Sequence, residues 1–319
     1  MEHNKKEVII EVPHRISGFF EIVDKKNGEQ ISNPEEIGSR GAGFNLNAIG
    51  RTKVIIEKTN DSSDHDLNIF INNEKLNERA ETTYFIYNYV KKRLKKSFQV
   101  NIIHNFDLPV GCGYGASGSG ALGAIYGLNK IFNLGLSLIE RGKIAHIAEV
   151  VNRTGLGTVC GQLCGGLCIL KEPGYPCVFE SISFPKNLEI ICGTFGMIHT
   201  KSILTDPLLN KEIKNAGRRA LNKLNKNKNI KTFIKCSIQF VKDTNILNIL
   251  NLSEIQELLE SLNKLDILGA SMNQLGRSVY AICQKSEINE VLEIFNSYKP
   301  EIQIFNLKIS TKGPTILQT

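Results

Sequence analysis

The alternation of hydrophobic and polar residues along the first half of the chain predicts a mixture of strands and helices. Runs of β-branched and aromatic residues predict strands, and apolar residues spaced three or four apart predict helices. The predicted strands are 8–12, 52–58, 66–71 and 98–106, and the predicted helices are 81–96, 122–132 and 137–153. Because Pro13 and several glycines interrupt the pattern, segments 13–22 and 38–44 are predicted to be loops.

In the second half of the chain, short apolar runs alternate with longer helical patterns. Segments 165–171 and 177–184 predict a strand pair around the turn at Pro173 and Gly174. Further strands are predicted at 188–195, 278–283 and 301–309, and helices at 206–224, 230–243, 253–265, 268–276 and 286–297. This order predicts an α+β sandwich in the later lobe. The boundary falls near 183–187, which divides the chain into domains 1–185 and 186–319.

The composition is that of a globular protein large enough for two lobes. The 319 residues are 41% hydrophobic and 22% charged, and no run approaches the ~18 apolar residues of a membrane helix. The charged N-terminus has no signal-like apolar core, so we expect a cytoplasmic protein without membrane contact. The net charge of +7 suits an anionic substrate.

Much of the positive charge is concentrated in residues 211–235, where many lysines and arginines accompany a single acid, Glu212. A nucleic-acid-binding surface and a solvated helix face both fit this pattern. We favour the helix face and expect no nucleic-acid partner, because aromatic residues that stack on bases are nearly absent.

The chain contains eight cysteines, which we expect to be reduced because no secretion signal precedes them. Cys160, Cys164 and Cys168 suggest a metal site by their regular spacing. The spacing matches neither the usual zinc pairs nor common iron–sulfur runs, and no histidine lies nearby. Small buried thiols packing a glycine-rich segment are the better interpretation.

A glycine-rich stretch at 109–123 follows a predicted strand and leads into a predicted helix. Glycines let the backbone approach a ligand closely, and a helix N-terminus favours anions. A flexible turn is the alternative, but the flanking elements favour phosphate binding. The candidate nucleotide-binding residues are Pro109, Gly111, Gly113, Gly115, Ala116, Ser117, Gly118 and Ser119.

Ser117, Ser119 and Glu149 are candidates for holding a metal ion beside that phosphate. Hydroxyl and carboxylate oxygens, with water, form a reasonable shell for magnesium. Glu149 lies among Ala148, Val150 and Val151 in a predicted helix, so an unpaired carboxylate there would be costly unless it had a role. The alternative is a surface glutamate.

Candidate residues for an anionic acceptor lie in the two early segments that are predicted to be loops. Arg15 and Arg40 could supply the guanidinium that a carboxylate prefers, with Ser39 and His14 beside them. For each arginine, an ordinary surface position is the alternative. For His14, a capped turn residue is the commoner role.

Residues 109–118, Pro-Val-Gly-Cys-Gly-Tyr-Gly-Ala-Ser-Gly, resemble the second motif of the GHMP small-molecule kinases, Pro-x-Gly-x-Gly-Leu-Gly-Ser-Ser-Ala. Tyr114, Ala116 and Gly118 depart from that pattern. Residues 310–317 resemble a degraded form of the third motif. The resemblance covers essentially the whole chain. It is narrowed to the archaeal pantoate kinase branch by segments 13–21, 38–46 and 155–159.

The resemblance implies the two-lobed GHMP kinase fold, of class α+β, with a lobe like ribosomal protein S5 followed by an α/β sandwich lobe. It implies ATP and Mg2+ as cofactors, pantoate as the acceptor, 4-phosphopantoate as the product for coenzyme A biosynthesis, and a homodimer.

By motif matching, Ser117 or Ser119 and Glu149 face the metal. Thr158 occupies the position at which relatives often carry an aspartate near the acceptor hydroxyl. A threonine hydroxyl cannot act as a base at neutral pH. Two alternatives therefore stay open: a GHMP kinase for a different acceptor, and a non-catalytic nucleotide-binding regulator.

Overall fold

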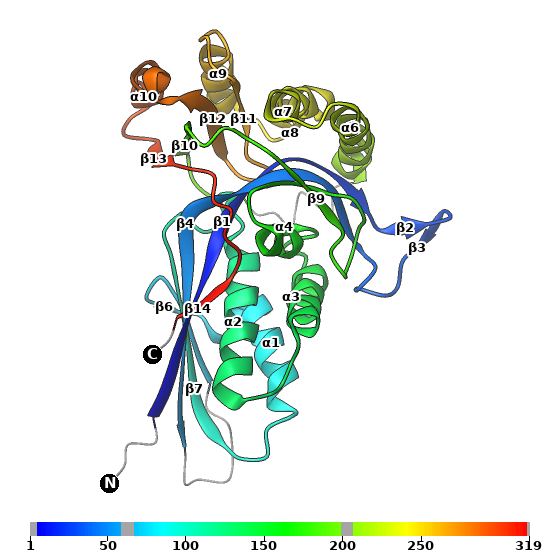
Figure 1. Ribbon diagram of the computed structural model, residues 1–319, viewed down its shortest axis with the longest axis vertical. Coiled ribbons are helices and arrows are strands. Elements are labelled where there is room, and N and C mark those ends of the chain that lie inside the picture. Colours follow the sequence, from blue (N-terminus) through cyan, green and yellow to red (C-terminus); the bar gives the residue numbers. More distant parts are fainter. Residues whose placement is uncertain (1–4, 59–66, 199–206, 318–319) are drawn as a thin grey trace.

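Two long antiparallel strands, β1 (Lys5–Val23) and β4 (Gly38–Lys58), run through most of the molecule (Figure 1). They pair from Lys5 opposite Glu57 to Val23 opposite Gly38. The computed structural model describes residues 5–58, 67–198 and 207–317. It places one layered lobe along the lower part of these strands and a second lobe above their curved upper ends.

The lower lobe is a mostly antiparallel sheet with three helices on one face. The sheet has the order β14-β1-β4-β7-β5-β6, and β8 and β9 extend it from β4. β5 is parallel to β7, and the other pairs are antiparallel. Its other strands are β5 (Leu67–Ile71), β6 (Glu74–Lys75), β7 (Phe98–Phe106), β8 (Leu167–Leu170), β9 (Phe179–Ile182) and β14 (Thr315–Leu317). The helices are α1 (Glu81–Lys91), α2 (Ala116–Phe132) and α3 (Leu138–Asn152), with η1 (Asn77–Arg79) before them and α4 (Thr158–Cys164) after them.

The upper lobe is a four-stranded antiparallel sheet covered by helices, with the strand order β11-β12-β10-β13. Its strands are β10 (Leu188–Thr194), β11 (Gly269–Met272), β12 (Ser278–Gln284) and β13 (Gln303–Leu307). Its helices are α6 (Pro207–Lys226), α7 (Ile230–Thr244), α8 (Ile246–Ile249), α9 (Ser253–Leu262) and α10 (Ile288–Asn296), with η2 (Lys285–Glu287) before α10. A short hairpin of β2 (Lys25–Lys26) and β3 (Glu29–Gln30) projects beside it. The predicted α+β class is confirmed.

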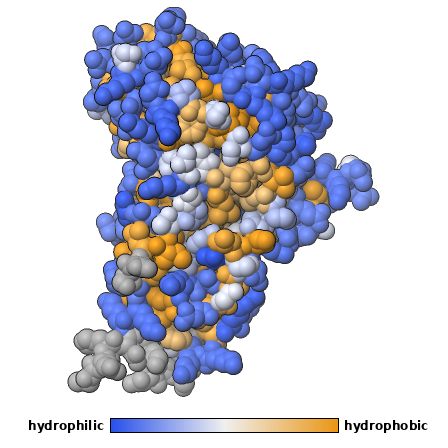
Figure 2. All heavy atoms as spheres, in the orientation of Figure 1, coloured by the Kyte–Doolittle hydropathy of each residue, from blue (hydrophilic) through white to orange (hydrophobic). Residues whose placement is uncertain are grey.

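The two lobes share buried residues where β1 and β4 pass beneath α6 and α7. Phe19 and Phe44 belong to the same hydrophobic cluster as Phe233 of α7 and Tyr280 of β12. The ring of Phe44 lies edge-on to both, with centroid distances of 5.8 Å to Phe233 and 5.7 Å to Tyr280. Figure 2 shows that hydrophobic residues also reach the surface near the junction of the lobes, whereas the upper end is mainly hydrophilic.

The predicted loops at 13–22 and 38–44 are wrong, because both segments belong to β1 and β4. Pro13 is tolerated because the register shifts between Pro13 and Arg15, which is where a sheet can accept a residue without an N–H. The glycines of 38–44 have a packing role. A Cβ on Gly43 would collide with the carbonyl oxygen of Ile16 on the neighbouring strand.

The predicted helix at 268–276 is also wrong, because the segment contains strand β11. All four residues of β11 are buried, and a short apolar run that is buried on every side has no periodicity that distinguishes a strand from a helix. The strand pair around Pro173 and Gly174 is confirmed as β8 and β9. Asp206, the predicted start of the next helix, lies outside the described residues.

The basic run 211–235 lies on α6 and α7, and several of its charges have partners. Lys214 contacts Asp24 at 2.6 Å, and Arg219 contacts Asp243 at 2.8 Å. These ion pairs support a solvated helix face, and the absence of a nucleic-acid partner stays a prediction. None of the helices in the described parts of the chain is long and apolar enough to cross a membrane.

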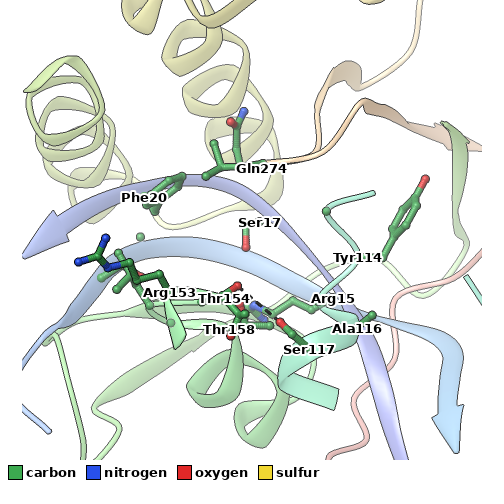
Figure 3. A pocket seen from close by; sticks show the side chains of 18 of the residues that line it. Arg15, Ser17, Phe20, Tyr114, Ala116, Ser117, Arg153, Thr154, Thr158 and Gln274 are labelled. Carbon is green, nitrogen blue, oxygen red and sulfur yellow. Dashed lines mark hydrogen bonds between the residues drawn. The ribbon is translucent and has the colours of Figure 1, made fainter. Parts of the chain in front are cut away.

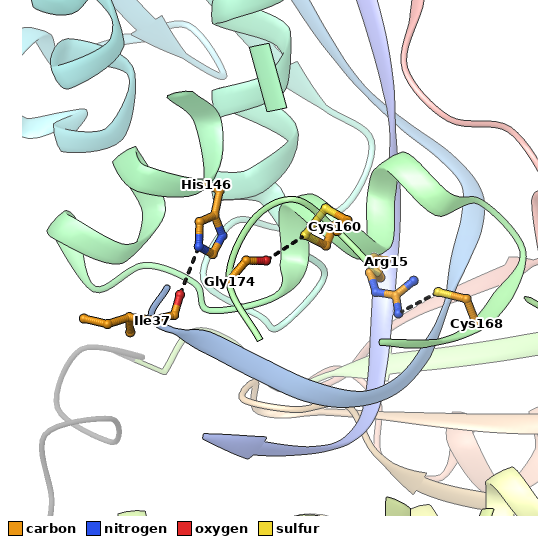
Figure 4. Close-up of a disulfide and its surroundings, with 7 residues drawn as sticks. Arg15, Ile37, His146, Cys160, Cys168 and Gly174 are labelled. Atoms are coloured by element: carbon orange, nitrogen blue, oxygen red, sulfur yellow. Dashed lines mark hydrogen bonds between the residues drawn. A yellow bond between two sulfur atoms is a disulfide. The ribbon is translucent and has the colours of Figure 1, made fainter. Parts of the chain in front are cut away.

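The expectation that all cysteines are reduced is wrong for one pair, because Cys160 and Cys177 form a disulfide (Figure 4). The bond connects α4 to the loop that precedes β9. These residues are 17 positions apart in sequence, and the connecting glycine-rich segment folds back so that the two meet. Cys164 and Cys168, in the same region, are free thiols.

Reducing this disulfide is expected to lower the free energy of unfolding by about 3 kcal/mol, the loop-closure effect for a loop of roughly this length. Urea unfolding with and without a phosphine reductant measures the difference. The double variant Cys160→Ser/Cys177→Ser should match the reduced protein and ignore the reductant, whereas Cys164→Ser should keep the response. An unchanged unfolding midpoint, with two extra thiols titrated, would contradict this prediction.

Candidate active site

A cavity of about 370 Å3 lies between the lobes, where the glycine-rich loop meets α4 and the upper parts of β1 and β4 (Figure 3). Its floor and walls come from segments far apart in the sequence. They include Arg15 and Ser17 of β1, Ser117 of α2, Thr158 of α4 and Leu275 of the upper lobe. The cavity therefore exists only when both lobes are assembled.

The glycine-rich loop presents the N-terminus of α2 to this cavity. Gly115, Ala116 and Ser117 all line it, and the N-cap residue, Gly115, has no side chain that could cap the first N–H groups of the helix. Gly111, Gly113 and Gly115 have φ angles of +76°, +86° and +71°, a region that residues with a side chain rarely adopt. Uncapped N–H groups at a helix N-terminus form a site for an anion, which supports the predicted phosphate binding.

Both lobes hold the loop in place through its carbonyl groups. The backbone N–H of Arg15 donates to the Tyr114 carbonyl at 3.0 Å, and the hydroxyl of Ser278 donates to the Cys112 carbonyl at 2.7 Å. Gln162 of α4 donates to the Gly115 carbonyl at 2.9 Å and to the Pro13 carbonyl at 3.0 Å. Nothing in the local sequence marks Gln162 as a residue that positions the loop.

His14, a predicted substrate contact, is instead part of this support. It is fully buried, and Nδ1 lies 3.0 Å from the Tyr114 carbonyl, so that nitrogen donates its proton. Burial lowers the pKa of His14 to about 4, which keeps the ring neutral. His14 does not line the cavity.

Glu149 is buried with one carboxylate oxygen unsatisfied. Its side chain is 1% exposed, and Oε1 accepts a hydrogen bond from Thr154 at 2.6 Å. Oε2 has no hydrogen-bond partner and faces Gly155, where a Cβ would collide with it. Burial raises the pKa of Glu149 to about 7, although the hydroxyls of Thr154 and Ser117 oppose the shift. A buried, unsatisfied carboxylate is costly, which points to a role for it.

The surroundings of Glu149 fit a magnesium ion that also binds phosphate. Ser117 lines the cavity and its hydroxyl lies 3.5 Å from the Thr154 carbonyl, next to the Glu149 side chain. No cluster of three or more histidine, cysteine, aspartate or glutamate residues occurs among the residues that the structure describes. One carboxylate with a hydroxyl is nevertheless enough for Mg2+, because substrate phosphates and water supply the remaining ligands.

Ser119, the other serine predicted to face a metal, points elsewhere. It is fully buried and its hydroxyl donates to the Val12 carbonyl at 3.3 Å. The two serines are two positions apart on α2, so they lie on different faces of the helix. The structure brings Ser117 to the cavity and leaves Ser119 against β1.

The two arginines predicted to bind the acceptor are both engaged by protein groups. Arg40 contacts Glu21 at 2.8 Å and does not line the cavity, although its neighbour Ser39 does. Arg15 lines the cavity but is 3% exposed, and its guanidinium donates to Asn45 at 3.3 Å and to Cys168 at 3.5 Å (Figure 4).

Thr158, the first residue of α4, lies beside Ser117 and Thr154 on the cavity wall. The hydroxyl of Thr158 and the carboxylate of Glu149 both face Gly155. If Gly155 carried a Cβ, that atom would lie 3.2 Å from the Thr158 hydroxyl oxygen. The residues of the degraded third motif do not line the cavity. Their backbone instead binds Asn45 and Gly166, through hydrogen bonds of 2.8 Å from Ser310 N to Asn45 O and from Gly166 N to Ser310 O.

Comparisons with known proteins agree with this arrangement. The family model of the GHMP kinases N terminal domain matches residues 81–166. A pantoate kinase from Methanocaldococcus jannaschii is 34% identical over 285 residues, which cover 89% of this chain and 96% of the relative. A pantoate kinase from Thermococcus kodakarensis is 28% identical over 309 residues, which cover 96% of each chain. A solved structure described as a phosphotransferase related to the CoA biosynthesis pathway superposes with a TM-score of 0.82 at 26% identity, covering 98% of this chain and 99% of that one.

The fold and the glycine-rich loop at the cavity are thus those of a GHMP kinase. Within that class the chain belongs to the pantoate kinase family, because a member that is 34% identical covers 89% of it. The resemblance stated from the sequence is confirmed.

Proposed function

We propose that this protein transfers the terminal phosphoryl group of ATP to the C4 hydroxyl of (R)-pantoate, giving 4-phosphopantoate for coenzyme A synthesis. The relatives named pantoate kinase support the acceptor. The observation that carries the reaction type is the cavity itself, where an uncapped helix N-terminus meets Ser117 and the unsatisfied oxygen of Glu149. Phosphoryl transfer needs this combination of a phosphate cradle and a metal site.

Each element of the cavity has a distinct task in this proposal. The N–H groups at the start of α2 bind the phosphates of ATP. Ser117 and Glu149 would hold the Mg2+ ion, which would neutralise charge on the phosphates. Gln162 and the backbone of Arg15 keep the loop from shifting, because both donate to its carbonyl groups.

Thr158 orients the acceptor hydroxyl and does not remove its proton. A threonine hydroxyl can hydrogen-bond the acceptor, but its pKa is far above neutrality. The transfer depends mainly on alignment and on electrostatic stabilisation, so a carboxylate at this position is not essential. The same residue favours a second candidate function, a nucleotide-binding regulator without kinase activity.

An assay of ADP release with pantoate, mevalonate and homoserine as acceptors tests the proposal. We expect turnover with pantoate, dependent on Mg2+, and little with the other two. Faster turnover of mevalonate or homoserine would contradict the acceptor. ATP binding without turnover of any acceptor would instead support the regulator.

We further propose that the enzyme works in the cytoplasm as a homodimer. Sedimentation equilibrium checks the second point, and the expected mass is twice the 35.5 kDa of one chain. A mass of one chain at micromolar concentration would contradict it.

A further inference from the structure

Arg153, at the rim of the cavity, has no partner for its side chain. It is exposed and lines the cavity together with Asn152 and Thr154. Every other arginine in the described part of the chain makes a side-chain hydrogen bond or ion pair, and Arg153 makes none. A free guanidinium beside a ligand cavity is available for an anion.

The backbone of Arg153 is held in an unusual conformation that fixes where its side chain begins. Its φ is +56°, in the left-handed region that few residues other than glycine adopt. The Arg153 N–H closes helix α3 by donating to the Glu149 and Val150 carbonyls. Glu149 and Arg153 therefore lie on one rigid turn, and this backbone strain at a cavity is typical of a functional position.

The position of Arg153 along the cavity separates it from the phosphate cradle. In the view of Figure 3, Arg153 lies on the opposite side of the cavity from Ala116 and Ser117, with Thr158 between them and Phe20 above Arg153. An acceptor that lay along the cavity with its hydroxyl at Ser117 and Thr158 would bring its other end to Arg153. In pantoate, that other end is a carboxylate.

The competing arginines are less suited to that carboxylate. The guanidinium of Arg40 is paired with Glu21 at 2.8 Å. The guanidinium of Arg15 donates to Asn45 and Cys168, and Gly161 covers it so closely that a Cβ there would collide with it. Arg15 thus packs beneath α4, whereas Arg153 is the cavity-lining cation, among the described residues, with all its donors free.

We propose that Arg153 binds the carboxylate of the acceptor and so selects a hydroxy acid over an uncharged alcohol. This inference rests on the proposed function, because it assumes that the acceptor hydroxyl is phosphorylated at the Ser117 end. A bidentate guanidinium–carboxylate pair recognises the charge and also the planar shape of the carboxylate.

The test compares pantoate with its carboxamide, which keeps the hydroxyl groups and methyl groups but lacks the charge. We expect wild-type kcat/KM to favour pantoate by about 100-fold, the effect of one charge-assisted hydrogen-bonded pair. In Arg153→Gly this preference should fall to about 3-fold or less, with the loss in the KM for pantoate and little change in the KM for ATP. Glycine suits the left-handed backbone, so this variant should keep or raise the melting temperature.

Two further variants serve as controls. Arg153→Lys should restore part of the preference, because it returns the charge without the planar fork. Arg141→Ala, on the same helix but over the ring of Tyr126, should keep the full preference.

A preference for the carboxylate that survives in Arg153→Gly, or a loss confined to the KM for ATP, would overturn the inference. Absence of any wild-type turnover of pantoate would count against the proposed function itself. In that case calorimetric binding of pantoate to wild type and Arg153→Gly decides the inference separately, and equal affinity overturns it.

Discussion

Glu149→Gln is expected to lower kcat by at least about 100-fold and, at the same time, to make the protein more stable at pH 8. The loss of activity follows from the proposed function, because glutamine cannot supply the charge that would hold Mg2+ beside Ser117. The gain in stability follows because the wild type buries a carboxylate whose Oε2 has no partner. Steady-state kinetics and urea unfolding measure the two effects.

The sign of the stability change depends on pH in a defined way. The pKa of Glu149 is about 7 in the folded protein, above its ordinary value of 4.5, so the folded state favours the protonated form. Below pH 4.5 the carboxyl is neutral in both the folded and the unfolded protein, so the variant should gain no stability over the wild type. Between pH 4.5 and 7 the wild type loses stability as pH rises, and above pH 7 the gain of the variant levels off at about 3 kcal/mol.

Glu140→Gln is the matched control, because Glu140 lies on the same helix with its side chain at the surface in a capping box with Ser137. This variant should keep full activity and should show no gain in stability at pH 8. A Glu149→Gln protein that retained activity, or that lost stability at pH 8, would show that the carboxylate is structural.

Gly115→Ala is expected to lower kcat/KM for ATP by about 100-fold, the penalty for a displacement of about 1 Å at a reacting group. Gly115 has φ +71°, and a Cβ there would lie 2.8 Å from Thr158 and 3.2 Å from Gln162. The methyl group would push the loop away from α4, which carries both residues. The loop would then present its N–H groups in the wrong place.

Gly135→Ala separates this effect from backbone strain. Gly135 has nearly the same angle, φ +70°, but nothing lies within 4 Å of its Cβ position. Both variants pay about 1 kcal/mol or more for an alanine in the left-handed region. Only Gly115→Ala should lose activity. Equal activities in the two variants would show that the contact with α4 does not matter.

Most helices and strands could be predicted from the sequence because their periodicity is local. The helices α1 and α3 and the strand β7 are predictable in this way, since their apolar faces repeat over nine residues or more. Segment 38–44 could not be predicted, because its glycines reflect the close approach of a strand from elsewhere in the chain. The strand β11 was missed because a fully buried short run shows no period.

Part of the candidate site was predictable from the sequence. Glu149 has apolar neighbours on a predicted helix, and burying a carboxylate there is costly unless it has a role. The site was not predictable where the decisive partner is distant in sequence. The sequence around Arg40 gives no sign that its guanidinium pairs with Glu21. Glu21 contacts Arg40 at 2.8 Å and Arg218 at 3.0 Å. Arg153 was missed because its left-handed backbone is visible only in three dimensions. The assignments of individual site residues stay predictions until the variants are measured.

The passage of β1 and β4 through both lobes has a consequence for how the protein comes apart. The residues that complete the core of the upper lobe, such as Phe19 and Phe44, belong to strands whose other ends form the centre of the lower sheet. Neither lobe can open while the other keeps these strands in register. Hydrogen exchange of the slowest amides should therefore report one common free energy of opening in both lobes, as for a single cooperative folding unit.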